Sequence, residues 1–236
     1  EILGTAPIAV NGGFVWDAGV IFGSPGQTLT VQNGVPTTLA GPPGVLARRL
    51  IGRELINNGT MSFSVGNRTG VHSGGIFRNT NMGQMNIQVG GGEVSTFAWD
   101  ASASRLVNEG IINYDTGAML DVEPPFDNAG TGLVNVSSFM RIGNGGLEQG
   151  SYVIASLGTL EYNGGNAVRT AVSGSSFSGP GVLAVRGTAE LTVEGSFAVP
   201  RLFLGGSGFG LFNWNQASPL ALTRLELVED SELQTQ

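Results

Sequence analysis

The chain has 236 residues, of which 39 are glycine and only 12% are charged, and its net charge is −7. Helices need charged, straight-chain residues on their exposed faces, and glycine inside a helix costs about 1 kcal/mol relative to alanine, so this composition excludes a helical protein. All eleven basic residues are arginine, and they form no basic stripe of the kind that binds nucleic acid; no stretch approaches the roughly 18 apolar residues that span a bilayer.

The N-terminal quarter combines strand patterns with a proline-rich passage. Phe14-Val-Trp16 and the alternating run 28–31 read as strands, and Trp16 falls at an inward position. Between residues 36 and 49 the prolines would interrupt a hydrogen-bonded ladder, so we expect a loop excursion there. Arg48, Arg49 and Arg53 are expected to lie in a solvated turn. The chain begins Glu-Ile-Leu rather than with methionine, from which we expect a mature product or a piece of a larger protein.

From residue 59 onward a short pattern repeats: glycine, any residue, an apolar residue, any residue, and an aromatic or β-branched residue. The copies begin at Gly59, Gly83, Gly110, Gly132, Gly158, Gly181 and Gly210, at intervals of 24, 27, 22, 26, 23 and 29 residues. A period in the twenties with one short strand per unit predicts a solenoid. We expect the last position of each copy to stack into one internal column, made of Phe63, Ile87, Tyr114, Val136, Tyr162, Val185 and Trp214.

A second element precedes the glycine in four units: an apolar residue, any residue, and an asparagine. The apolar and asparagine pairs are Leu55 with Asn57, Phe77 with Asn79, Leu106 with Asn108, and Phe126 with Asn128. If successive turns stack about 4.8 Å apart, the apolar members form an internal column. The asparagines then lie above one another and exchange side-chain amide hydrogen bonds.

The remaining segments fit less regularly into this scheme. Residues 91–103 are expected to be a second loop excursion, and units between 143 and 199 are extra faces of the same turns. Residues 220–228 alternate as a final strand, and residues 229–236 are expected to fray. We interpret residues 1–236 as one β-solenoid domain.

Few side chains offer chemistry. Asp115, Asp121, Glu123 and Asp127 lie within thirteen residues of a turn-rich stretch, and oxygen ligands on a loop suit Ca²⁺, although a solvated corner between turns is the favoured explanation. No other cofactor is indicated, and the absence of cysteine excludes thiolate ligands and disulfides.

The aromatic residues and the single histidine give weaker signals. Trp99 is the one aromatic residue that we expect to contact a glycan, because Trp16 and Trp214 fall at core positions. His72 is the only histidine, and no nucleophile and carboxylate can be assigned beside it, so we identify no catalytic residue.

Longer runs of the sequence resemble a known repeat. Residues 126–136, 146–162, 176–185 and 210–214 are similar to the β-solenoid repeat of large bacterial surface and secreted proteins of the haemagglutinin-adhesin type, with its Phe-x-Asn-x-Gly-x-Val and Gly-x-Gly-x-Leu motifs. The resemblance extends over about residues 10–215. It implies a parallel β-helix and a cell-surface setting, and because its motifs are structural it transfers no catalytic residue.

These observations predict an all-β protein, a right-handed, single-stranded parallel β-helix of about ten coils. The expected role is a structural or adhesive segment of a bacterial cell-surface or secreted protein, a rigid rod that presents a face to a glycan or a surface protein. Neighbouring repeats or subunits would cap its open ends, with neither nucleic acid nor membrane insertion involved. The alternatives are a carbohydrate-active enzyme, a lyase or depolymerase, which would gather Asp115, Asp121, Glu123 and an arginine in one groove, and a viral tail-fibre segment, which would be trimeric.

Overall fold

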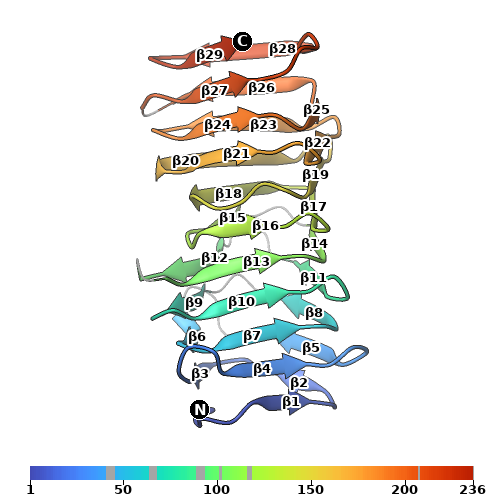
Figure 1. Ribbon diagram of the computed structural model, residues 1–236, viewed down its shortest axis with the longest axis vertical. Helices are drawn as coiled ribbons and strands as arrows, with labels where there is room; N and C mark the ends of the chain where they lie inside the picture. Colours follow the sequence, from blue (N-terminus) through green and yellow to red (C-terminus); the bar gives the residue numbers. More distant parts are fainter. Residues whose placement is uncertain are drawn as a thin grey trace.

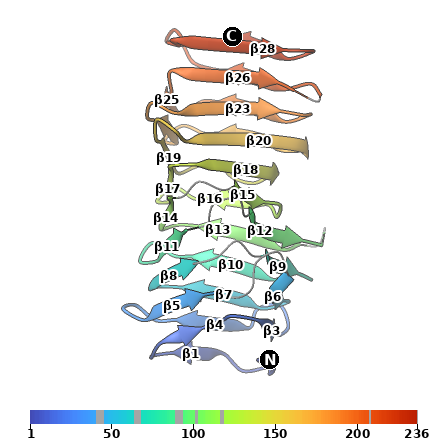
Figure 2. The same cartoon turned by 180° about the vertical axis from the view of Figure 1, so that it is seen from behind.

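A computed structural model describes residues 1–40, 46–63, 68–88, 94–100, 103–115, 119–206 and 208–235, and every regular element in these ranges is a β-strand. The chain winds repeatedly through three walls, and each strand pairs in parallel with the strand one turn below and one turn above it. Figures 1 and 2 show the resulting stack, with the N-terminus at one end and the C-terminus at the other. The predicted parallel β-solenoid is confirmed, with about nine turns.

We name the three walls sheets A, B and C. Sheet A has ten strands: β3 (Gly19–Phe22), β6 (Leu46–Ile51), β9 (Arg68–His72), β12 (Val94–Trp99), β15 (Met119–Val122), β18 (Phe139–Asn144), β20 (Thr159–Asn166), β23 (Val182–Arg186), β26 (Arg201–Gly205) and β28 (Arg224–Val228). Sheet C has nine strands: β2 (Phe14–Val15), β5 (Pro36–Leu39), β8 (Thr60–Phe63), β11 (Gln84–Ile87), β14 (Ile111–Tyr114), β17 (Leu133–Val136), β19 (Ser151–Ile154), β22 (Ser176–Ser178) and β25 (Ser196–Ala198).

Sheet B is divided into two parts. The lower part has six strands: β1 (Ile8–Val10), β4 (Thr28–Val31), β7 (Glu54–Asn57), β10 (Ile76–Asn79), β13 (Arg105–Asn108) and β16 (Phe126–Asn128). The upper part has four: β21 (Val168–Ala171), β24 (Glu190–Val193), β27 (Leu211–Trp214) and β29 (Glu232–Thr235). Between them a single residue, Glu148, bridges Asn128 below and Ala171 above.

The core is a continuous internal column of apolar side chains. Leu55, Phe77, Leu106 and Phe126 occupy matched register positions on sheet B and are buried, as predicted. Trp16 and Trp214 are also buried, which confirms their placement in the core.

The seven glycine-led copies do not form one column. The first four lie on sheet C, the copies after Gly158 and Gly181 lie on sheet A, and the copy after Gly210 lies on sheet B. The expected single column of their terminal residues is therefore wrong, although all seven residues are buried. The pattern describes any short strand that follows a corner with one side facing the core, so it does not distinguish the three walls.

The glycines of this pattern are required by close approach between turns. None of the seven has a positive φ. A Cβ at Gly83 would lie 2.3 Å from the carbonyl oxygen of Asn57 and 2.3 Å from Asn79 Oδ1, and one at Gly110 would lie 2.2 Å from the carbonyl oxygens of Gly83 and Thr80. These distances leave no space for any side chain.

The predicted asparagine ladder is present and fully buried. Asn57 Nδ2 donates to Asn79 Oδ1 at 2.8 Å, Asn79 Nδ2 to Asn108 Oδ1 at 2.9 Å, and Asn108 Nδ2 to Asn128 Oδ1 at 2.9 Å. The lowest rung is closed by the Gly59 amide, which donates to Asn57 Oδ1 at 3.2 Å. The ladder satisfies amide groups that would otherwise be buried without partners.

A second, outer asparagine ladder lies on the half-buried outside of sheet C. Asn113 Nδ2 donates to Asn86 Oδ1 at 2.9 Å, and Asn135 Nδ2 donates to Asn113 Oδ1 at 2.7 Å. The same bonding thus occurs once inside the wall and once outside it.

Three expected irregular segments contain regular strands. Residues 36–49 include β5 and the start of β6; Pro36 is the first residue of β5, a position where proline is tolerated. Residues 91–103 include β12, which pairs with β9 and β15. The expected frayed tail 229–236 includes β29, which pairs with β27. The parts of these segments at 41–45, 91–93, 101–102 and 236 lie outside the described residues.

The expected solvated arginine turn is also wrong for two of its members. Arg48 and Arg53 are fully buried, whereas Arg49 is exposed. Arg48 Nε donates to Thr69 Oγ1 at 3.1 Å, and burial lowers the pKa of Arg48 to about 10. Arg53 Nη2 donates to the carbonyl oxygen of Gly4 at 2.6 Å, which joins the N-terminal segment to the third turn.

Candidate functional site

The four carboxylates expected to bind calcium lie on different walls of the solenoid. Asp115 follows β14 of sheet C and is exposed, Asp121 lies in β15 of sheet A with Glu123 just after it, and Asp127 lies in β16 of sheet B. Within the described part of the chain, no group of three or more His, Cys, Asp and Glu residues is placed to hold a metal ion.

Arginines engage three of these carboxylates, and the first pair is Arg68 with Glu123, whose Nη2 and Oε1 atoms lie 3.5 Å apart. Arg141 donates to both oxygens of Asp121, with the Nε to Oδ1 distance at 2.9 Å. Arg105 Nη1 lies 3.0 Å from Asp127 Oδ2, and the Leu147 amide donates to Asp127 Oδ1 at 3.0 Å. These groups have the geometry of ion pairs that join successive turns.

A shallow hollow of about 210 Å³ on the outside of sheet A contains part of the acidic cluster. It is lined by Asp121, Glu123, Arg141, Gly143, Asn144 and Asn163. Asp115 does not line it. Hydrogen bonding to Asp121 is the largest influence on the pKa of Arg141 and contributes to raising it, and Asn144 Nδ2 donates to the Glu123 carbonyl oxygen at 2.5 Å. Asp121 and Arg141 thus bind each other within the hollow, whereas the Glu123 carboxylate lies 3.5 Å from Arg68 Nη2 and Asn163 Nδ2 donates to Glu161 Oε1 at 2.8 Å.

Asp121 and Arg141, which line this hollow, are also part of a row of alternating charges along sheet A. Asp121, Arg141 and Glu161 occupy matched positions on three successive strands, and Arg186 Nε lies 3.2 Å from Glu161 Oε2. On sheet B, Arg78 bridges Glu54 below and Glu109 above, each at 2.6 Å. Half-exposed pairs of this kind contribute modestly one by one, and both rows connect neighbouring turns.

A buried ionic network fills the gap in sheet B. Glu148 and Arg169 are fully buried and form an ion pair. The hydroxyls of Tyr152 and Tyr162 donate to the Glu148 carboxylate at 2.5 and 3.1 Å. Burial is the largest influence on the pKa of Glu148 and raises it above its ordinary value. Sealed from solvent, these groups serve the packing of the wall.

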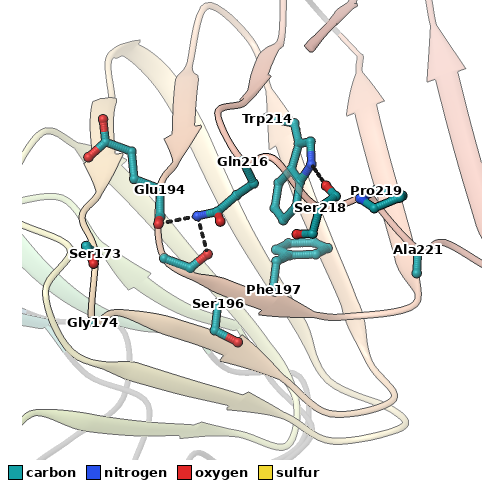
Figure 3. Close-up of a pocket in the computed structure, with 11 residues that line it drawn as sticks. Ser173, Gly174, Glu194, Ser196, Phe197, Trp214, Gln216, Ser218, Pro219 and Ala221 are labelled. Carbon is teal, nitrogen blue, oxygen red and sulfur yellow. Dashed lines mark hydrogen bonds between the residues drawn. The ribbon is translucent and has the colours of Figure 1, made fainter. Parts of the chain in front are cut away.

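A second and larger hollow, about 420 Å³, lies where sheet C ends. It is lined by Ser173, Gly174, Glu194, Gly195, Ser196, Phe197, Trp214, Gln216, Ser218, Pro219 and Ala221. Figure 3 shows Phe197 and Trp214 on one side of this sheet C hollow and Ser173 and Glu194 on the other. The two aromatic rings meet edge to face, with centroids 6.0 Å apart at 70°.

The chain forms this hollow by leaving the wall. β25 is the last strand of sheet C, and residues 215–223, which would supply the next one, form a loop between β27 and β28. Gln216 Nε2 donates to the carbonyl oxygens of Glu194 and Gly195, and Trp214 Nε1 donates to the Ser218 carbonyl oxygen at 2.8 Å. Sequence reasoning missed this site; the only signal was the polar run 215–219 between two strand patterns.

Trp99 and His72, the two other residues singled out from the sequence, lie at the ends of β12 and β9. Trp99 is the last residue of β12, and its side chain lies outside the described residues. His72 ends β9, and its Nδ1 lies 3.6 Å from Asp100 Oδ2. Among the described residues no helix is long and apolar enough to cross a membrane.

Comparisons with known proteins do not assign the chain to a family. No protein-family model matches the chain, and no curated protein matches it. Among solved structures, the crystal structure of a TibC-catalysed hyper-glycosylated fragment of TibA, residues 55–350, matches 98% of this chain and 92% of its own length. The sequence identity is 13% and the TM-score is 0.25.

Proposed function

We propose that this chain is a rigid structural or adhesive segment of a bacterial cell-surface or secreted protein. The observation that carries the proposal is the continuity of bonding along the long axis. Every wall is a parallel ladder, and the asparagine ladders and charge rows add side-chain bonds between successive turns. Such a stack resists bending and holds its loops at fixed spacing.

The open end at the C-terminus supports neighbouring repeats or subunits as partners. β28 is the last strand of sheet A. Its Leu225 and Leu227 align with buried Leu202 and Leu204 of the turn below, yet Leu227 is 53% exposed. A further turn placed on this end would bury both leucines and pair the open strand edge.

A carbohydrate-active enzyme is the second candidate, and the hollow on sheet A is the observation that favours it. Asp121, Glu123 and Arg141 line that hollow together. A general acid and base need carboxyl groups that can exchange protons with a substrate, whereas the Asp121 carboxylate is engaged on both oxygens by Arg141. The rod is therefore the stronger proposal.

Surface labelling and an activity screen test the proposal together. Antibodies against the chain should label intact cells of the organism that produces it or precipitate it from the medium, and the purified chain should release no reducing ends or unsaturated products from polysaccharides. Labelling only after cell lysis would refute the surface role. Product release that is lost in Asp121→Asn would establish the enzyme instead.

A further inference from the structure

The sheet C hollow is open to solvent, whereas the carboxylates of the row on sheet A are paired with arginines. Its occupant is constrained by charge, shape and hydrogen-bonding groups. The hollow measures about 420 Å³, which is in the range of small-molecule sites. We propose that it binds a neutral saccharide.

The charge of the lining excludes anionic ligands. Glu194 is the one charged residue among the lining residues that the structure describes, and none of them is basic. A phosphate, a sulfated sugar or a uronic acid would meet the Glu194 carboxylate with no cation to compensate it. A ligand without charge meets no such penalty.

The hydrogen-bonding groups suit a ligand with several hydroxyls. Ser173, Ser196 and Glu194 line the hollow, with Ser173 and Glu194 on the side away from Trp214 (Figure 3), and Glu194 Oε1 also accepts a hydrogen bond from Asn215 Nδ2 at 3.4 Å. Gln216 is anchored through its Nε2 atom on two carbonyl oxygens, so its side-chain oxygen remains as an acceptor at a fixed place. Hydroxyls both donate and accept, so a sugar can satisfy carboxylate, amide and serine groups together.

The apolar side of the hollow completes the match. Phe197 is half-buried on β25 and packs against Phe212 and Trp214, with ring centroids 5.6 and 6.0 Å away. The C–H face of a pyranose buries apolar area against aromatic rings while its hydroxyls remain available for hydrogen bonds. The packing of the rings and the anchored Gln216 make the site preformed, which lowers the cost of binding.

An extended peptide added to the edge of β25 is the rival occupant. β25 has three residues, so it offers few backbone pairs. The loop 215–223 already bonds the chain on both sides of β25. Before β25, Gln216 donates to the Glu194 and Gly195 carbonyl oxygens. After β25, the Thr223 backbone amide donates to the Pro200 carbonyl oxygen at 2.8 Å. The saccharide is favoured for these reasons.

Saturation-transfer NMR on the 236-residue chain tests the proposal. The probes are maltotriose, cellotriose and triacetylchitotriose, with trigalacturonate as the acidic probe and a Thr-Val repeat peptide as the strand probe. We expect transfer to at least one neutral trisaccharide and none to the acidic or peptide probe. Transfer to no neutral probe, or transfer to the peptide or to trigalacturonate instead, overturns the proposal.

Two variants locate the binding. Ser196→Arg fills the hollow and should weaken binding at least about tenfold, and Phe197→Leu, which keeps an apolar side chain but removes the ring, should weaken it by about tenfold. Ser156→Arg is the matched control because Ser156 is exposed in a turn outside the hollow, and it should bind normally. Equal binding by Ser196→Arg and Ser156→Arg, both with unchanged circular dichroism and melting temperature, places the sugar elsewhere and refutes the site.

The inference rests on the proposed function only for its biological meaning, as a ligand for an adhesive rod. The two fail separately: an intracellular chain that binds saccharide would refute the surface role alone, and a surface rod that binds none of the neutral probes would refute the hollow alone.

Discussion

Replacing one buried ladder asparagine should cost far more stability than replacing its counterpart on the outside of the wall. Asn79 and Asn113 are both middle rungs, each bonded to an asparagine above and one below. They differ in solvent access: Asn79 is fully buried and Asn113 is half-buried. The pair Asn79→Ala and Asn113→Ala therefore varies burial while keeping the chemistry of the rung the same.

The magnitude follows from the groups that lose partners. In Asn79→Ala, Asn108 Oδ1 loses its ladder donor, and Asn57 Nδ2 keeps only a 3.3 Å bond to the Gln84 carbonyl oxygen. The Ile111 carbonyl oxygen also loses a donor at 3.1 Å. Each buried group left unsatisfied costs about 1–3 kcal/mol, so we expect a loss of about 3 kcal/mol or more. Water can replace the missing amide at Asn113, so we expect a loss below about 1 kcal/mol there.

Urea denaturation and amide hydrogen exchange measure both variants. Long repeat arrays can lose all-or-none unfolding, so exchange of the amides in β7 and β10 reports the local free energy directly, and the urea midpoint reports the whole stack. Equal losses in the two variants would refute the reasoning, because they would show that burial does not set the cost of breaking a rung.

Four further outcomes are expected. Gly110→Ala should lower the free energy of unfolding by at least about 2 kcal/mol, since its Cβ meets two carbonyl oxygens at 2.2 Å. The control Gly130→Ala, at an open position, should change the free energy of unfolding by less than about 0.5 kcal/mol, and similar losses in the two variants would contradict this. Glu148→Gln leaves the Arg169 guanidinium buried without a counterion and should cost about 3–5 kcal/mol, and the double variant with methionine at both positions should cost less than the single change; a costlier double variant in urea denaturation would contradict it. Burial raises the pKa of all three tyrosines above their usual value of about 10, so the folded chain holds these protons more tightly than the unfolded chain does. Their contribution to stability is therefore complete below pH about 10 and is lost as the pH rises above it. Ultraviolet titration should show tyrosinate only as the chain unfolds, and a normal titration of the folded chain would argue against this. Calcium and chelator should leave the melting temperature unchanged, since arginines pair with three of the four carboxylates of the acidic cluster and the fourth, Asp115, lies apart from them; a rise with calcium would contradict this.

The sequence was sufficient to predict the fold and the inner ladder because both depend on local, repeated chemistry. The Leu-x-Asn spacing at Leu55 and Asn57 recurs at the same point of successive turns, and a polar side chain repeated inside a wall can be satisfied by its own copies. Alternation across short strands likewise predicted which residues face the core.

Assignment of strands to walls could not be read from the same pattern. Gly-x-apolar-x-aromatic fits any wall, so the pattern predicts one column for the copies after Gly158 and Gly210 although they lie on sheets A and B. The sheet C hollow escaped for a related reason. It exists because one strand is missing and a loop takes its place, and no residue in 215–219 is unusual for a turn.

The register column of sheet B that contains the ladder asparagines is polar only in its middle part. The matched positions run Val31, Asn57, Asn79, Asn108 and Asn128, and continue through Glu148 and Ala171 to Val193 and Trp214. Because the glycine pattern fits every wall, a chain wound one wall out of phase would still bury apolar side chains. It would also set the asparagines and Glu148 against partners that cannot bond them, at the full cost of buried unsatisfied groups. This column therefore fixes the winding phase of the chain, so that wrongly wound forms are penalised while the apolar core alone would tolerate them.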